Sequence, residues 1–284
     1  MPSRPARYAV IGNPIAHSRS PEIHAMFAAQ TGQAIDYGRL LAPVEGFAAA
    51  VDAFRAEGGL GLNVTLPFKP EAFAYARRRT PRAEIAGAVN TLAFYGEDVL
   101  GDNTDGPGLV LDIRDRIGLP LAGARLLLLG AGGATRGVVR PLLEAGVARL
   151  AVANRTASRA IALRDELAAR LDPADAARLS AGGLDDVDGG FDAIVNATAA
   201  GLAGEAPALP QAAWRGARLA LDMVYGARPT AFMQAALAAG VPRVEDGLGM
   251  LVGQAAESFA IWRGVRPEVA PVYAALRARL AGAG

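Results

Sequence analysis

The chain has 284 residues, of which 52% are hydrophobic and 20% charged, and its net charge at pH 7 is +1. This length allows about two domains and a sizeable core, so we expect a soluble globular protein. The small net charge does not predict the basic surface that a nucleic-acid partner requires, and no apolar run reaches the roughly 18 residues of a membrane span.

Short apolar strands alternate with helical patterns through the first part of the chain, which is typical of a parallel α/β protein. The predicted order is strand, helix, strand, helix, strand, at residues 7–12, 21–32, 34–41, 44–58 and 59–65. Ser20 directly before Pro21 is the usual order of an N-cap residue and the first residue of a helix. Two apolar runs on either side of Gly96 and Glu97 predict a β-hairpin after these elements.

A predicted helix at 105–118 leads to a second series of alternating elements. These are strands at 125–130, 149–155, 191–198 and 217–225, with helices from the first glycine turn to Ala145 and at 157–171. The chain after Gly247 predicts two more helices, because Leu, Tyr and Trp recur there at helical spacing.

The chain contains no cysteine and only two histidines, His17 and His24. Disulfides, thiolate chemistry and metal centres built on Cys or His are therefore not expected, and we predict no metal. The N-terminus lacks the long apolar region of a signal peptide, so we expect a cytoplasmic protein.

A glycine-rich turn follows the predicted strand at 125–130. Its sequence, LLLLGAGGATRG, places Gly130, Gly132 and Gly133 between a strand and a helix. A dinucleotide fold needs glycines here because the backbone must turn tightly and approach the pyrophosphate. The match to G-x-G-x-x-G is imperfect, since Thr135 takes the sixth position, and an ordinary tight turn is the alternative. The strand-turn-helix context favours a nucleotide site.

The segment ANRTASR follows the next predicted strand. An NAD site places an acidic residue here to bind the ribose hydroxyl, whereas NADP needs cations for its 2′-phosphate. This segment carries Asn154, Arg155, Thr156 and Arg159 and no acidic residue. The guanidinium of Arg155 suits bidentate contact with a phosphate, and Thr156 can also cap the next helix. We therefore predict NADP as the cofactor.

Lys69 is the only lysine among 29 basic residues. It follows NVTLPF, a strand that ends in Asn63 and Thr65, and ligands bind at such strand ends in α/β folds. Unlike arginine, lysine can release a proton near neutral pH and so act as a general acid or base. Survival of one lysine by chance in an arginine-rich chain is the alternative; composition and position alone do not decide between them.

Two further polar turns follow other strands. NPIAHSRSP presents Ser18 and Ser20, and GDNTDG presents Asn103, Thr104 and Asp105. Such residues often only hydrogen-bond their own backbone. Their recurrence beside a predicted cofactor domain instead favours a site for a polyhydroxylated ligand, in which a Lys and an Asp form a proton-transfer pair.

Taken together, the motifs resemble shikimate dehydrogenase, in the order of that family, from Tyr8 to about Trp262. They are YAVIGNPIAHSRSPEIH, NVTLPFK, AGAVNTL, GDNTDG, GAGGATRG, NRT, VNAT and DGLGMLVGQAAESFAIW. The resemblance implies reversible, NADP-linked reduction of 3-dehydroshikimate to shikimate, a step of aromatic amino-acid biosynthesis. It also implies an α/β substrate-binding domain at 1–106 and 256–284, a Rossmann-like NADP-binding domain at 107–255, and an active site in the cleft between them.

The resemblance makes Lys69 and Asp105 the catalytic pair, with Lys69 transferring the proton at the substrate C3 oxygen. The predicted substrate-binding residues are Ser18, Ser20, Asn63, Thr65, Asn90, Asp105, Tyr225 and Gln254, with both serines on the substrate carboxylate. The predicted cofactor-binding residues are Gly130, Ala131, Gly132, Gly133, Ala134, Asn154, Arg155, Thr156, Arg159, Met223 and Gly247.

The chain departs from the family pattern at a few positions. Ala199 and Ala200 stand where many members have serine, and Pro81 stands where an acidic residue often contacts the cofactor. Two alternatives remain open: a quinate/shikimate dehydrogenase with relaxed substrate or cofactor choice, and a non-catalytic NADPH-binding regulator. We expect a small-molecule substrate and a monomer or homodimer.

Overall fold

The computed structural model describes residues 5–198 and 205–282, and their backbone divides into two compact units. The units comprise Met1–Gly108 with Val252–Val272 (unit 1) and Leu109–Leu251 with Tyr273–Gly284 (unit 2). The sequence predicted that all residues from 256 on belong to the first domain. In the structure the last residues group with unit 2, because the Arg116 guanidinium lies 4.1 Å from the Tyr273 ring and Arg277 pairs with Asp246.

Unit 1 is built on a mixed sheet (sheet 1) with the strand order β2-β1-β3-β5-β6-β4. Its strands are β1 (Ala6–Gly12), β2 (Ile35–Leu41), β3 (Gly59–Val64), β4 (Arg78–Arg79), β5 (Thr91–Tyr95) and β6 (Asp98–Asp102). β1 pairs in parallel with both β2 and β3, whereas β5 and β6 form the predicted antiparallel hairpin. The carboxyl ends of β1 and β3 therefore lie at the same edge of the sheet, and this edge carries the polar turns.

The helices of unit 1 are α1 (Ser20–Thr31), α2 (Phe47–Ala56), α3 (Lys69–Tyr75) and α4 (Pro81–Ala86). The helices α5 (Asp105–Leu111), α10 (Leu248–Arg263) and α11 (Val269–Gly282) each begin in one unit and end in the other. The prediction that Ser20 caps α1 was wrong, because α1 begins at Ser20 itself and no side chain caps its start. The Ser20 hydroxyl instead accepts a hydrogen bond from the Ser18 hydroxyl at 3.2 Å.

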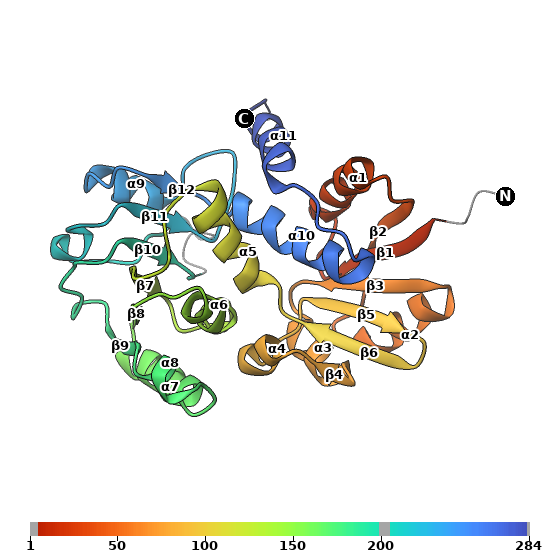
Figure 1. Cartoon of the computed structure of the whole chain (residues 1–284), viewed down its shortest axis with the longest axis horizontal. Helices are drawn as coiled ribbons and strands as arrows, with labels where there is room; N and C mark the ends of the chain where they lie inside the picture. Colours follow the sequence, from red (N-terminus) through yellow and green to blue (C-terminus); the bar gives the residue numbers. More distant parts are fainter. Residues whose placement is uncertain (1–4, 199–204, 283–284) are drawn as a thin grey trace. The chain divides into compact units, whose positions relative to one another are not determined.

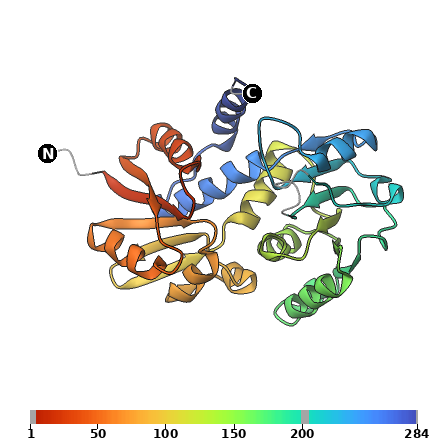
Figure 2. The same cartoon turned by 180° about the vertical axis from the view of Figure 1, so that it is seen from behind.

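Alternation along the strands of sheet 1 divides its side chains between two faces. On β3, Leu62 and Val64 join the apolar core that includes Val51 and Phe68, next to α2 and α3. Gly61 and Asn63 consequently point to the other face, where α10 packs (Figures 1 and 2, blue). Trp262 of α10 donates from its indole Nε1 to the Leu92 carbonyl there, at 2.9 Å.

Unit 2 contains an all-parallel sheet (sheet 2) with the order β12-β11-β10-β7-β8-β9 (Figure 1). Its strands are β7 (Arg125–Leu129), β8 (Arg149–Asn154), β9 (Leu179–Gly183), β10 (Ala193–Asn196), β11 (Leu219–Asp222) and β12 (Val244–Glu245). This is the doubly wound order, in which the chain changes direction between β7 and β10, and nucleotides bind at that switch point. β7 reads as an unbroken run of leucines because it is buried on both faces.

The helices that belong to unit 2 alone are α6 (Gly133–Glu144), α7 (Ala157–Ala168), α8 (Pro173–Ala176) and α9 (Ala231–Ala238). A π-helical turn at Asp112–Arg116 continues α5, and a 3-10 turn spans Gln211–Trp214. Within the described ranges no helix is both long and apolar enough to cross a membrane. The same residues contain no cluster of three or more His, Cys, Asp or Glu able to hold a metal ion.

Candidate functional site

Lys69 and Asp105 are in direct contact in unit 1. Lys69 is the first residue of α3 and Asp105 the first of α5, so each follows a turn at the end of a strand. The Lys69 Nζ donates to Asp105 Oδ2 at 2.5 Å, and the two side chains are 29% and 17% exposed. The pair is thus ion-paired yet still reachable from outside the protein, as a proton-transfer pair must be.

Asn90 fixes the orientation of Asp105. Its Nδ2 donates to Asp105 Oδ1 at 2.8 Å, and its Oδ1 accepts from the backbone N–H of Thr104 at 2.9 Å. Asn90 is only 2% exposed, so its amide cannot turn away without losing buried hydrogen bonds. Gln254 approaches the same amide, with its Oε1 at 3.4 Å from Asn90 Nδ2. The structure therefore brings together four predicted residues: Lys69, Asn90, Asp105 and Gln254.

The turn that carries Asp105 is held by the buried carboxylate of Asp102. Arg82 makes a bidentate contact with it, at 2.7 and 2.6 Å, and the backbone N–H of Asn103 donates to it at 2.7 Å. Thr80, which caps α4 through the N–H of Ala83, also donates to it at 2.6 Å. Pro81 is the first residue of α4, so the position that departs from the family pattern has a helical role here.

Ser18 and Ser20 lie next to each other in the turn between β1 and α1. In addition to the contact between their hydroxyls, the backbone N–H of Ser20 donates to Ser18 Oγ at 3.3 Å. Arg39 of β2 fixes the turn through its Nη2, which donates to the Ser18 carbonyl at 2.6 Å. Thr65 is partly buried beyond β3, where its Cγ2 would lie 2.6 Å from a Cβ placed at Gly12. Glycine at position 12 lets the two turns approach this closely.

Asn63 is buried within unit 1, as Asn90 is. It is 4% exposed, and both ends of its amide already have partners inside unit 1. Its Oδ1 accepts from the Tyr37 hydroxyl at 2.7 Å and contacts His24 Nε2 at 3.1 Å, and its Nδ2 donates to Ser258 Oγ at 2.9 Å. These contacts connect Asn63 to β2, α1 and α10.

In unit 2 the glycine turn lies at the switch point of sheet 2. Gly130 has φ +102°, a conformation that favours glycine, and its carbonyl accepts from the Thr135 hydroxyl at 2.7 Å. A Cβ at Gly132 or Gly133 would meet no other heavy atom within 4 Å, so the turn is open on that side. The first turn of α6 thus presents its backbone N–H groups to any anion that approaches, as a pyrophosphate site requires.

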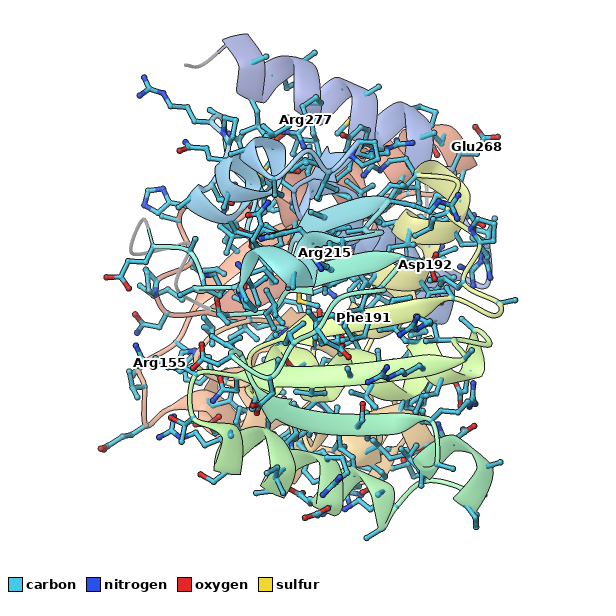
Figure 3. All side chains as sticks on the ribbon, turned by 90° about the vertical axis from the view of Figure 1, so that its left-hand side faces the viewer. Arg155, Phe191, Asp192, Arg215, Glu268 and Arg277 are labelled. Atoms are coloured by element: carbon cyan, nitrogen blue, oxygen red, sulfur yellow. The ribbon has the colours of Figure 1, made fainter. Side chains whose placement is uncertain are left out.

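A cavity of about 730 Å³ lies beside this turn. Its lining includes four of the predicted cofactor residues, Gly130, Asn154, Arg155 and Arg159, together with Leu184, Asp185, Thr198, Glu205, Ala206, Pro207 and Ala208. Figure 3 shows Arg155 just beyond the carboxyl end of β8, on the opposite side of the view from Asp192, which precedes β10. The Asn154 side chain donates to the Thr156 carbonyl at 3.0 Å, and the Thr156 side chain does not cap α7.

Met223 and Gly247 come together in unit 2. A Cβ at Gly247 would lie 2.1 Å from the Met223 carbonyl oxygen, so only glycine fits this approach. The backbone N–H of Gly247 also donates to the Val224 carbonyl at 3.1 Å. Tyr225 follows in the same partly buried segment. Two of the predicted cofactor residues are thereby adjacent, while Ala199 and Ala200 lie outside the described residues.

Several contributors to the site were not predicted. Those in unit 1 are Tyr37, Arg82, Thr91, Asp102 and Ser258, and those in unit 2 are the cavity residues from Leu184 onward. Ser258 follows Gln254 by one helical turn on α10, which is a signal that the sequence did offer. Thr91 and Asp102 likewise adjoin the predicted Asn90 and the polar turn at Asn103, whereas the contacts of Tyr37 and Arg82 join segments far apart in the chain.

The fold and the site define a class of protein. A doubly wound sheet with a glycine turn at its switch point and an arginine-lined cavity is typical of dinucleotide binding, and unit 1 adds a Lys–Asp pair suited to proton transfer. Together they are typical of a nicotinamide-dependent oxidoreductase.

Comparisons with known proteins give the family. Family models match residues 10–92 (shikimate dehydrogenase substrate binding domain), 113–202 (shikimate / quinate 5-dehydrogenase) and 247–277 (shikimate 5′-dehydrogenase C-terminal domain). The shikimate dehydrogenase (NADP(+)) of Bordetella petrii is 57% identical over 280 residues, which cover 96% of each chain. The chain belongs to the shikimate dehydrogenase family, which confirms the resemblance seen in the sequence.

Solved structures agree with this assignment. The crystal structure of an Ael1 enzyme from Pseudomonas putida has a TM-score of 0.90 and 46% identity, covering 95% of this chain and 98% of that one. Shikimate 5-dehydrogenase from Thermus thermophilus, in complex with NADP(H) and shikimate, has a TM-score of 0.83 and 36% identity over 97% of this chain and all of that one. The predicted fold class, a substrate-domain α/β unit plus a Rossmann-like unit, is confirmed.

Proposed function

We propose that the protein is an NADP-dependent shikimate dehydrogenase that catalyses the reversible reduction of 3-dehydroshikimate to shikimate in aromatic amino-acid biosynthesis. The observation that carries the proposal is the Lys69–Asp105 contact at 2.5 Å, held in place by Asn90. Its relatives at more than half identity over nearly their whole length carry the same activity in their names. A regulator that only bound NADPH would have no need of this pair.

In this proposal unit 1 holds the substrate. The Ser18 and Ser20 hydroxyls bind its carboxylate, and Thr65, Asn90, Asp105 and Gln254 bind its ring hydroxyls. Lys69 Nζ moves the proton to or from the C3 oxygen. Asp105 holds Lys69 in place through its second carboxylate oxygen while its first is fixed by Asn90. These contacts orient the reacting carbon and keep the proton donor within reach.

Unit 2 is proposed to hold NADP. The glycine turn with Ala131 and Ala134 would bind the pyrophosphate, and Arg155 and Arg159 the 2′-phosphate, since both arginines line the cavity beside the turn. Met223 and Gly247, which adjoin each other, would also contact the cofactor. The bound cofactor supplies the hydride in reduction and accepts it in the reverse direction. A cytoplasmic location and a monomeric or homodimeric state stay predictions.

The test follows the absorbance of reduced nicotinamide with shikimate or quinate and NADP or NAD. We expect wild type to prefer shikimate and NADP, and Lys69→Ala to lose about 10²-fold or more in kcat, as removal of a general acid or base does. Lys69→Arg should lose a similar factor, because arginine keeps the charge but does not release the proton.

Arg77→Ala is the matched control. Arg77 is also a cation and lies just after α3, the helix that Lys69 begins, and its side chain is 61% exposed. It should leave kcat unchanged. A wild-type protein without turnover would overturn the enzyme assignment in favour of a regulator. Turnover in Lys69→Ala equal to wild type would overturn the role of Lys69, and a preference for quinate would make the protein a quinate/shikimate dehydrogenase.

A further inference from the structure

The carboxamide of Asn63 joins two parts of the proposed substrate site that the sequence treats as separate. One part is the serine turn, which includes Ser18 and Ser20. The other is the group around Lys69 and Asp105. Asn63 lies on β3 between them, on the face of sheet 1 where α10 packs.

On the side of the serine turn, two elements reach Asn63 Oδ1. Tyr37 of β2 donates its hydroxyl at 2.7 Å, and His24 of α1 contacts it through Nε2 at 3.1 Å. His24 stands one turn after Ser20 on α1, and Tyr37 stands two residues before Arg39, which binds the Ser18 carbonyl. The helix that follows the serine turn and the strand whose Arg39 binds that turn thus both contact the same oxygen.

The rings of Tyr37 and His24 also stack on each other, with their centroids 4.2 Å apart and their planes 7° from parallel. Burial raises the pKa of Tyr37 well above its ordinary value. Because the hydroxyl keeps its proton, it donates to Asn63 Oδ1.

On the catalytic side, Asn63 Nδ2 donates to Ser258 Oγ at 2.9 Å and to Thr91 Oγ1 at 3.3 Å. The hydroxyls of Thr91 and Ser258 are 2.7 Å apart, and Thr91 Oγ1 donates to Asn90 Oδ1 at 2.9 Å. Asn90 in turn holds Asp105. An unbroken series of hydrogen bonds therefore runs from Tyr37 through Asn63 to the catalytic carboxylate.

We infer that Asn63 and Tyr37 are positioning residues, which hold the serine turn at a fixed place relative to Asn90 and Asp105. The inference rests on the proposed function, in which Ser18 and Ser20 bind the substrate carboxylate. It replaces the prediction that Asn63 binds the substrate itself. A displaced serine turn weakens binding of the carboxylate end but leaves the reacting end in place, so the effect falls on KM rather than on kcat.

Tyr37→Phe tests this directly, because it removes one hydroxyl and keeps the ring stacked on His24. We expect the KM for shikimate to rise about 3- to 10-fold, the usual effect of one hydrogen bond, with kcat within about 2-fold of wild type. The KM for NADP should not change. Tyr95→Phe is the matched control: Tyr95 ends β5 in the same unit with its side chain 53% exposed, and its loss of a hydroxyl should leave all three parameters unchanged.

A double-mutant cycle identifies the serine turn as the point of action. Ser20→Ala should raise the KM for shikimate by itself, and Tyr37→Phe should add little to it, because its effect passes through the serine turn that Ser20 belongs to. Full additivity of the two, or a Tyr37→Phe variant that behaves like Tyr95→Phe, would overturn the inference while the proposed function stands. Absence of turnover in the wild type would overturn both.

Discussion

His24 is a buried residue whose charge state decides whether it could donate a proton in catalysis or only supports the fold. It is fully buried beside Tyr37, Phe27, Phe259 and Trp262, and burial lowers its pKa to about 3, with the Asn63 hydrogen bond opposing the shift. The ring is therefore neutral at physiological pH and cannot serve as a proton donor in catalysis. Its contribution is structural and depends on pH.

We expect the folded protein to lose stability as the pH falls from about 6.5 toward 3. In that range the unfolded chain protonates His24 and the folded chain does not, so the unfolded state binds more protons. Between pH 7 and pH 5 this lowers the free energy of unfolding by about 2 kcal/mol. Urea unfolding of wild type and His24→Gln at both values of pH measures the difference.

The exposed His17 provides the control for this measurement. His17→Gln should lose as much stability between pH 7 and pH 5 as wild type does. His24→Gln should lose about 2 kcal/mol less than wild type over the same range. Equal pH dependence in all three proteins would show that burial of His24 is not the cause.

Arg155 gives a second prediction for a single residue. Arg155→Ala should raise the KM for NADP about 10- to 100-fold, the range for a hydrogen bond to a charged group, and should leave the KM for NAD nearly unchanged. Arg164→Ala is the control, since Arg164 lies on α7, the helix that follows Arg155, and pairs with Asp165 away from the cavity. Steady-state kinetics with each cofactor measure both KM values. An equal rise in KM for NAD and NADP would mean that Arg155 does not bind the 2′-phosphate.

Individual residues of the site were predictable to different degrees. Lys69 and Asp105 stand out because each follows a strand in a polar turn, and their contact is in the structure as the resemblance implied. The placement of Asn63 was not predictable, since a polar residue at the end of an apolar strand looks the same whether it faces a ligand or a helix. Only the packing of α10 on that face decides it.

Glycines set how closely the elements approach one another. A Cβ at Gly61 of β3 would lie 2.5 Å from Trp262 Nε1 of α10 and 2.7 Å from the Leu92 carbonyl oxygen. A similar approach occurs at Gly253 of α10, where a Cβ would lie 2.7 Å from the Gly108 carbonyl oxygen at the end of unit 1. The position of α10, which carries Gln254 and Ser258, therefore depends on these small residues.

Gly61→Ala should displace Trp262 and with it α10. We expect the free energy of unfolding to fall by about 1–3 kcal/mol, the usual cost of overpacking, and the KM for shikimate to rise because Gln254 moves. Gly38→Ala is the control, because a Cβ at Gly38 on β2 meets no heavy atom within 4 Å. Denaturant unfolding and kinetics measure both effects; equal stabilities of the two variants would contradict the close packing described for α10.

The elements found from the sequence are those with strong patterns. The long helices and the buried strands appear close to their predicted limits, as β7 and α10 do. β9 and α9 were missed: β9 lies in a stretch rich in Asp and Gly, and it is a strand because it pairs with β8. Pairing between distant segments cannot be read from local composition, and the same holds for the short strands β4 and β12.

At the scale of the whole molecule, each unit is proposed to hold one ligand, and their effects on stability should be separable. A ligand at about 100 times its Kd stabilises the folded state by about 2.7 kcal/mol. We expect NADP to raise the melting temperature of Lys69→Ala as much as that of wild type. Shikimate should likewise raise the melting temperature of Arg155→Ala as much as that of wild type. Scanning calorimetry with each ligand measures this. Loss of both shifts in either variant would contradict separate binding by the two units.

The way the chain divides between the units has a consequence for its synthesis. The strands of sheet 2 are complete by Glu245, whereas the second segment of unit 1, Val252–Val272, emerges from the ribosome later. Until then the strands of sheet 1 exist without Trp262 on Gly61 or Ser258 on Asn63, and a polar amide remains exposed where a helix will cover it. Domains generally fold as units while the chain is made. Sheet 1 thus receives its covering helix only after every strand of sheet 2 has been made, so chains truncated before Val252 should hold a folded sheet 2 but not a complete unit 1.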